Sequence, residues 1–222
     1  MTPKLFIQAI TKLLAGIILV GLLIFFPAGG PFFGGILLMA VLFVPITCVG
    51  IVMMIKNPDL LKRRLDAKEK LAEQKRVVRL CGIMFLSGFV ISGLTVRFGW
   101  YTLPVGVSYT AAVVFLLGYV IYAEVLRENT YLSRTVEVTS GQRVIDTGLY
   151  GIVRHPMYFA TVIMFISMPF ILGSIYAAPI FMLYPFIIAK RIISEEELLV
   201  RELEGYVEYK EKVKYRLIPL VW

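Results

Sequence analysis

Long apolar runs separated by short polar segments are the main pattern along this chain of 222 residues. A helix needs roughly 20 apolar residues to cross the hydrocarbon core of a bilayer. Four runs meet this length, and they cover about residues 5–26, 32–55, 78–97 and 104–126. Prolines and glycines at 27–31, and an aromatic pair at 100–101, indicate short turns between successive runs. The pattern therefore predicts four transmembrane helices.

A fifth apolar run extends from Met157 to Ala189, which is too long for one comfortable span and short for two full ones. Pro169 and the pair Gly173-Ser174 interrupt this run near its middle. Basic residues stand just before and just after it. Because basic residues collect on the cytoplasmic side of a membrane, both ends of the run are expected there. We therefore expect a hairpin of two short helices, in an all-α protein with about six membrane-embedded segments.

The distribution of charge predicts the topology and narrows the class of partner. With a cytoplasmic N-terminus, all of the 23 Lys and Arg residues except Arg97 fall on the cytoplasmic side, and the C-terminus is cytoplasmic too. A content of 59% hydrophobic residues excludes an ordinary soluble domain. The net charge is +8, and the basic residues lie between the apolar runs. This arrangement fits loops that face membrane lipids and argues against a nucleic-acid partner.

The polar segments divide the chain into two regions. Residues 1–126 form a predicted four-helix transmembrane region with a basic cytosolic loop at 56–79, and residues 127–222 form a predicted catalytic core. The loop carries charges of both signs, so we interpret it as a solvated helix along anionic lipid headgroups, with a partner-docking surface as the alternative. The two outer turns are too short to build a site, so chemistry is expected on the cytoplasmic side.

The first candidate site is the segment 147–158, which reads TGLYGIVRHPMY. Pro156 suits the first turn of a helix, where its missing N–H group costs nothing. The free N–H groups of such a helix start, together with Arg154, predict a pocket for a carboxylate or another anion. Gly148 and Gly151 would let the backbone approach a ligand closely. His155, the single histidine of the chain, stands between an arginine and a proline at the membrane boundary, which favours a functional role.

The second candidate site lies just after the fifth run, where three consecutive glutamates begin at Glu195. They open an amphipathic stretch whose apolar side carries Leu199, Leu203, Tyr206 and Val213. A glutamate facing the helix that starts near Arg154 would place an arginine and a carboxylate on opposite walls. That pair would suit a zwitterionic ligand, with its carboxylate on the arginine and its ammonium on the glutamate. The sequence contains no metal-ligand cluster.

These motifs resemble the C-terminal signature of a known family. GLYGIVRHPMYFA, an apolar hairpin, EEELL and then EGYVEYKEKVKYRLIP are similar in order and spacing to the isoprenylcysteine carboxyl methyltransferase family, which is related to the phospholipid methyltransferases. The resemblance covers roughly residues 141–219. It implies a polytopic membrane enzyme with a cytosolic amphipathic C-terminal helix, which binds S-adenosylmethionine between this helix and the hairpin.

The resemblance also implies site residues at the matching positions. With Gly148 included, the candidates for binding the cofactor are Gly148, Tyr150, Arg154, His155, Pro156, Tyr158, Glu195 and Glu196. The candidates for catalysis are Arg154, Glu196 and Arg216, of which Arg216 would help to define the acceptor site. Tyr206, Tyr209 and Pro219 match the family's C-terminal segment. This chain has Leu203-Glu204-Gly205 where relatives commonly show Phe-Gly, so Glu195 and Glu196 both stay open as the residue that faces the cofactor.

The expected reaction is transfer of the sulfonium methyl group of S-adenosylmethionine to a lipid-linked or prenylated acceptor. The other product is S-adenosylhomocysteine. A carboxylate acceptor is already ionised at neutral pH, whereas an amine acceptor needs a base, for which Glu195, Glu196 or His155 are candidates. The alternatives are a phospholipid ethanolamine N-methyltransferase, a sterol-type membrane reductase with a nicotinamide cofactor, and a small transporter. The spans are nearly free of charge, which argues against the transporter.

Overall fold

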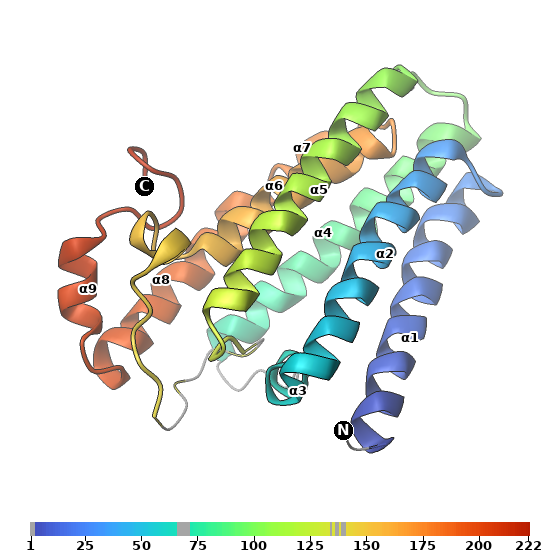
Figure 1. The fold of residues 1–222 in the computed structure, drawn as a ribbon. Helices are drawn as coiled ribbons and strands as arrows, with labels where there is room; N and C mark the ends of the chain where they lie inside the picture. The colour runs from blue at the N-terminus through green and yellow to red at the C-terminus, as the bar shows by residue number, and fades with distance from the viewer. Residues whose placement is uncertain (1–2, 66–71, 134, 136–137, 139–140) are drawn as a thin grey trace.

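The computed structural model describes residues 3–65, 72–133, 135, 138 and 141–222, so residues 66–71 of the predicted basic loop lie outside the described part of the chain. Helices are the regular elements of this part (Figure 1). In chain order they are α1 (Pro3–Ala28), α2 (Phe33–Lys56), α3 (Pro58–Leu65), α4 (Ala72–Arg97), α5 (Val105–Glu128), the 3-10 turn η1 (Gly148–Gly151), α6 (Pro156–Ile171), α7 (Ala178–Phe181), α8 (Tyr184–Glu202) and α9 (Tyr206–Lys212).

The four predicted transmembrane helices are α1, α2, α4 and α5. Each is long and apolar enough to cross a membrane, so the chain is a multi-pass membrane protein. Helix α4 begins at Ala72, before the apolar run itself, so the helix also includes the polar residues that precede the run. The expected all-helical fold is therefore confirmed. The cytoplasmic location of the two termini stays a prediction.

Helix α3 packs against the protein, which differs from the expected solvated helix on the membrane surface. Its residues Leu60 and Leu61 are buried in a cluster with Leu5, Met53 and Leu126. The side-chain oxygen of Asn57 accepts a hydrogen bond from the backbone N–H of Leu60 (3.1 Å) and so caps the start of the helix. The two leucines give this short helix an apolar side, and residues of α1, α2 and α5 cover that side.

The fifth apolar run leaves one end of the bundle and returns to it. Helix α6 ends at Ile171, and α8 leads back after the short helix α7 (Figure 1). At the far end, the backbone N–H of Leu103 donates to the carbonyl of Gly173 (2.9 Å), and the hydroxyls of Thr95 and Ser174 lie 2.8 Å apart. These contacts join the end of α4 and the α4–α5 turn to the turn that follows α6. The run thus forms the expected hairpin, while the count of six membrane-embedded segments stays a prediction.

One apolar core joins the two predicted regions of the chain. It contains Ile24 and Leu38 from α1 and α2, Phe115 from α5, and Phe181 and Ile188 from the hairpin. Helices α5 and α6 pack along each other, so the hairpin rests directly on the transmembrane helices (Figure 1). The polar half of α8 is thereby held beside the start of α6, and this is where the candidate site lies. The division into two domains remains a prediction.

The predicted amphipathic stretch after the hairpin is not one continuous helix. Helix α8 ends at Glu202, and Gly205 turns the chain with a φ of 80°, a value that favours glycine. Helix α9 starts at the next residue. The predicted apolar side nevertheless packs as a unit, in a cluster that contains Leu203, Tyr206, Tyr209 and Val213 with Val144 against them.

Candidate functional site

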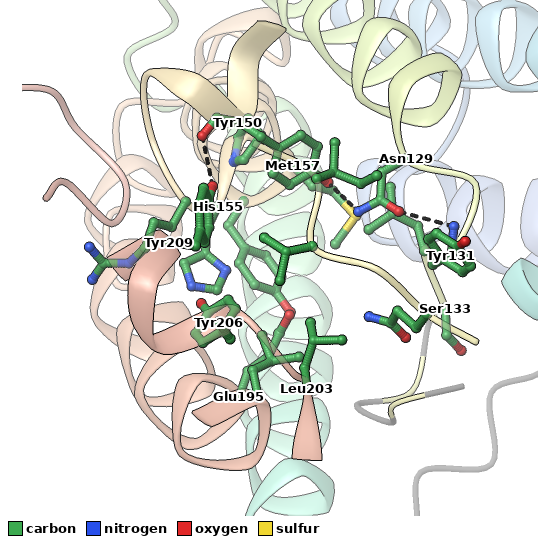
Figure 2. Close-up of a pocket in the computed structure, with 18 of the residues that line it drawn as sticks. Asn129, Tyr131, Ser133, Tyr150, His155, Met157, Glu195, Leu203, Tyr206 and Tyr209 are labelled. Atoms are coloured by element: carbon green, nitrogen blue, oxygen red, sulfur yellow. Dashed lines mark hydrogen bonds between the residues drawn. The ribbon is translucent and has the colours of Figure 1, made fainter. Parts of the chain in front are cut away.

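A cleft opens where residues 129–133 and 142–145, the start of α6, the polar half of α8, and α9 meet (Figure 2). The cleft is open to solvent on one side, and the space inside it that a water-sized sphere can occupy is about 100 Å³. Figure 2 shows Asn129, Tyr131 and Ser133 on one side of the cleft and His155, Tyr206 and Glu195 across from them.

Arg154, His155 and Pro156, which we call the RHP motif, fix the C-terminal segment to the start of α6. Pro156 is the first residue of α6, as expected. The backbone N–H groups of Arg154 and His155 donate to the carbonyls of Tyr215 and Arg216, each at 2.9 Å. These two N–H groups stand just before the helix start that was predicted to bind an anion, and they bind the protein's own chain.

Glu196 lies at the centre of a buried cluster of charges. Its Oε1 atom accepts hydrogen bonds from Nε of Arg154 (2.6 Å) and lies 3.3 Å from Nε2 of His155, and its Oε2 accepts from Nε of Arg216 (2.9 Å). The Glu196 side chain is only 3% exposed. Burial acts to raise the pKa of its carboxyl group, but the hydrogen bonds from these three residues outweigh it and hold the pKa well below its ordinary value.

Arg154 and Glu196 bind each other directly and do not stand on opposite walls of a site. The Nη1 atom of Arg154 also donates to the carbonyl of Val213 (2.6 Å), so this guanidinium links α8, the C-terminal segment and the start of α6. Arg154 still borders the cleft, whereas Glu196 and Arg216 lie outside its lining. The structure thus brings the three predicted catalytic residues together, and their catalytic role stays a prediction.

Glu195, the neighbour of Glu196, lines the cleft. Its Oε2 atom accepts a short hydrogen bond from the hydroxyl of Tyr158 (2.5 Å), and that hydroxyl in turn accepts one from Nε of Arg191 (2.9 Å). The rings of His155 and Tyr158 are stacked, with centroids 5.7 Å apart. Of the two glutamates that the sequence left open, the structure places Glu195 at the cleft.

The tyrosines of the cleft differ in how their hydroxyl groups are satisfied. The hydroxyl of Tyr150 accepts from Nδ2 of Asn129 (3.1 Å), and the hydroxyl of Tyr209 donates to the carbonyl of Tyr150 (2.7 Å; Figure 2). The hydroxyl of Tyr206 is buried and has no hydrogen-bond partner among the described residues. Buried polar groups are nearly always paired, so this hydroxyl is an exception among the tyrosines of the cleft.

Gly148 lies outside the lining of the cleft and meets a carboxylate of the protein itself. Its φ is 51°, and a Cβ atom there would lie 2.1 Å from Oε1 of Glu128. This carboxylate accepts from the hydroxyl of Thr147 (3.0 Å) and from the backbone N–H of Leu149 (3.2 Å). The glycine thus allows the end of α5 to hold the turn that carries Tyr150. The close approach expected from the sequence exists, but its partner is Glu128.

Most of the predicted binding residues come together, and one wall of the cleft was not predicted. The predicted binding residues that line it are Tyr150, Arg154, His155, Pro156, Tyr158 and Glu195, and it is lined as well by Tyr206 and Tyr209, which matched the family's C-terminal segment. The unpredicted wall includes Asn129, Tyr131, Leu132 and Ser133. These residues belong to an irregular segment, where neither periodicity nor a motif indicates a site. The one available signal was their position between the last transmembrane helix and the RHP motif.

Comparison with known proteins gives two partial likenesses. The mouse (Mus musculus) Delta(14)-sterol reductase TM7SF2 is 28% identical over 91 residues, which are 40% of this chain and 22% of the reductase. The chain thus spans less than a quarter of that relative's length. The solved structure of the eukaryotic intramembrane Ras methyltransferase ICMT matches with a TM-score of 0.50 and 18% identity. That match covers 85% of this chain and 74% of the other, and it shows a shared fold.

A family model adds a finding that does not depend on the fold. The model of the isoprenylcysteine carboxyl methyltransferase (ICMT) family matches residues 109–201. This range contains most of α5, the RHP motif, the hairpin and Glu195, and therefore most of the cleft. The family-model match and the shared fold support the membership of this chain in the isoprenylcysteine carboxyl methyltransferase family.

Proposed function

We propose that the chain is an integral membrane methyltransferase that binds S-adenosylmethionine in the cleft and methylates a lipid-linked acceptor. The observation that carries this proposal is the overlap between the family-model match and the cleft, because residues 109–201 supply both Arg154 and Glu195. Its N- and C-termini would lie in the cytoplasm, where the positively charged segments are expected.

The residues of the cleft fit the chemistry of this cofactor. A carboxylate, as on Glu195, suits the ammonium group of the amino-acid part. The unpaired hydroxyl of Tyr206 offers a hydrogen bond at the same cleft. The stacked rings of His155 and Tyr158 present aromatic surface, which favours a nearby sulfonium cation. The carboxylate and the aromatic surface thus suit two different parts of the same molecule, its ammonium group and its sulfonium.

The chain's own residues would position the reactants and exclude water. Bound S-adenosylmethionine would supply an electrophilic methyl group. The pair Arg154–Glu196 would keep α8, the C-terminal segment and the start of α6 in register, so that Glu195 and Tyr206 face one cleft. Fixing two reactants in an aligned geometry can supply a large part of a rate enhancement in such a transfer.

The charges around Glu196 favour an acceptor that needs no base. Its lowered pKa makes Glu196 a weak proton acceptor. A carboxylate acceptor, such as that of an isoprenylcysteine-like lipid, is already ionised at neutral pH and needs no proton removed. A phospholipid ethanolamine is the alternative acceptor, with Glu195 or His155 as the candidate base. The lipid part of either acceptor would reach the site from the bilayer.

A membrane reductase is a second candidate, and the match to the sterol reductase favours it. A reductase of this kind would use a nicotinamide dinucleotide, whose phosphates require several positive charges or free N–H groups. Arg143, Arg154 and Arg191 line the cleft, so its charge does not separate the two candidates. We rank the methyltransferase first because the family model matches most of the residues that form the cleft, and we separate the two candidates by ligand binding.

The test is calorimetric titration of the purified full chain in detergent with S-adenosylmethionine, S-adenosylhomocysteine and NADPH. We expect saturable binding of the first two and none of NADPH. Glu195→Gln should weaken binding of S-adenosylmethionine by about ten- to a hundredfold, because it removes a charged hydrogen-bond acceptor. Glu197→Gln is the matched control, since Glu197 is an exposed neighbour on the same helix. Binding of NADPH alone, in folded protein, would replace the proposal with the reductase.

The acceptor class is then decided by the product. Membranes that contain the protein are supplied with S-adenosylmethionine carrying a labelled methyl group, and the labelled lipid is treated with mild base. A methyl ester releases its label as methanol, whereas an N-methyl group keeps it. Release of the label supports a carboxylate acceptor, and retention would move the assignment to the phospholipid amine.

A further inference from the structure

Two neighbouring arginines of α3 reach across to the cleft wall that the sequence did not predict. The Nη2 atom of Arg63 donates to the carbonyl of Thr130 (2.7 Å), and Nη1 of Arg64 donates to the carbonyl of Ser133 (3.0 Å). Between these two anchored carbonyls lie Tyr131 and Leu132, both of which line the cleft. Two side chains from the N-terminal half thus hold the ends of a short stretch of the wall.

Arg64 also contacts the opposite wall of the cleft. Its Nη1 atom lies 3.6 Å from the sulfur of Met157, the second residue of α6, which lines the cleft as well. Its Nη2 atom donates to the hydroxyl of Tyr122, and the guanidinium lies 5.6 Å from the centre of that ring. One planar group therefore touches the segment 129–133 on one side and α5 and α6 on the other.

The side of α3 away from these arginines is packed against the bundle. Leu60 and Leu61 bury the other side of α3 in a cluster with Leu5, Met53 and Leu126. An arginine presents several donors in a fixed plane, so it can bridge two walls at a set separation, which a lysine ammonium on a flexible stem does not do. The contacts thus require the planar guanidinium of an arginine, and a positive charge alone would not make them.

We propose that Arg64 is a positioning residue that sets the separation of the two cleft walls, with Arg63 holding the same stretch at its other end. Both arginines lie outside the residues matched by the family model. The N-terminal half of the chain therefore takes part in shaping the binding site. The effect on S-adenosylmethionine rests on the proposed function, whereas the effect on the segment 129–133 does not.

The experiment compares Arg64→Lys and Arg63→Lys with Lys62→Ala in the full-length protein in detergent. Lys62 is exposed on the same short helix and serves as the matched control. Amide hydrogen exchange, followed by mass spectrometry on peptides covering residues 129–133, reports the wall without any ligand. We expect exchange in these peptides to be about tenfold faster in Arg64→Lys, about threefold faster in Arg63→Lys, and unchanged in Lys62→Ala.

Calorimetry with S-adenosylmethionine on the same samples gives the second readout. Arg64→Lys should bind about tenfold more weakly although its charge is kept, because the bridging hydrogen bonds are lost. Unchanged exchange in both arginine variants would overturn the inference, and so would wild-type affinity in Arg64→Lys. If the wild-type protein does not bind S-adenosylmethionine, the proposed function fails, and the exchange comparison alone decides whether the arginines hold the wall.

Discussion

The Nε atom of Arg154 lies 2.6 Å from Oε1 of Glu196, and the two side chains are 5% and 3% exposed. Removing charges from water is costly, and it is tolerated where each charge is paired and its remaining hydrogen-bonding groups are satisfied. Here the carbonyl of Val213 accepts a hydrogen bond from Arg154, and Arg216 and His155 both contact the Glu196 carboxylate. The pair therefore joins α8 to the C-terminal segment at the back of the cleft.

Loss of the Glu196 charge should destabilise the protein. In Glu196→Gln, Arg154 and Arg216 keep their positive charges without a carboxylate between them, and breaking a buried ion pair in this way costs about 3–5 kcal/mol. Thermal unfolding in detergent measures the effect. Glu197→Gln, on the exposed side of α8, should change the unfolding temperature little. Equal unfolding temperatures for Glu196→Gln and the wild type would contradict a structural role for the pair.

The same carboxyl group predicts how stability depends on pH. Because its pKa is lowered in the folded protein, Glu196 binds a proton more readily in the unfolded chain, where its pKa is about 4.3. Its contribution is therefore complete above this pH and is lost as the pH falls further. We expect the difference in unfolding temperature between wild type and Glu196→Gln to shrink as the pH falls from about 6 to about 3. A difference that stays constant over this range would contradict the lowered pKa.

Tyr206 and Tyr209 allow a matched comparison, because both are buried tyrosines of α9 and, within the described part of the chain, only the hydroxyl of Tyr209 has a partner. Tyr209→Phe removes the hydrogen bond to the carbonyl of Tyr150 and should cost about 1 kcal/mol of stability. Tyr206→Phe removes an unpaired hydroxyl, so the stability should stay the same or rise slightly. Its affinity for S-adenosylmethionine should fall several-fold. Unfolding and titration of both variants check this, and reduced stability with unchanged affinity in Tyr206→Phe would argue against a ligand contact.

Those features of the fold that depend on local composition were predictable from the sequence. The lengths of the apolar runs gave the four transmembrane helices, since roughly 20 residues are needed to cross a bilayer. Pro169, the pair Gly173-Ser174 and the basic flanks gave the hairpin, because helix breakers and charge both act locally. The position of Pro156 gave the start of α6.

The features that the sequence did not predict depend on contacts between distant segments. Arg154 and Glu196 are 42 residues apart, and their direct pairing follows from the register of α6 against α8. The sequence around each residue does not distinguish this direct pairing from an arrangement in which the two side chains face each other across a ligand. The wall at 129–133 has no periodicity of its own, and Arg63 and Arg64 hold it from 67 and 69 residues away. Charged residues in a loop predict a solvated surface, and only the fold shows their partners.

Gly148 tests whether the turn before the RHP motif depends on its contact with Glu128. In Gly148→Ala, the new Cβ atom would lie 2.1 Å from Oε1 of Glu128, at a φ of 51° that disfavours side chains. The carboxylate must then leave Thr147 and Leu149, so we expect a loss of about 2 kcal/mol or more in the free energy of unfolding. Gly82→Ala, at a position in α4 where a Cβ meets nothing within 4 Å, should not destabilise the protein. Because the turn carries Tyr150 to the cleft, Gly148→Ala should also weaken binding of S-adenosylmethionine, and full stability of this variant would show that the turn does not need Glu128.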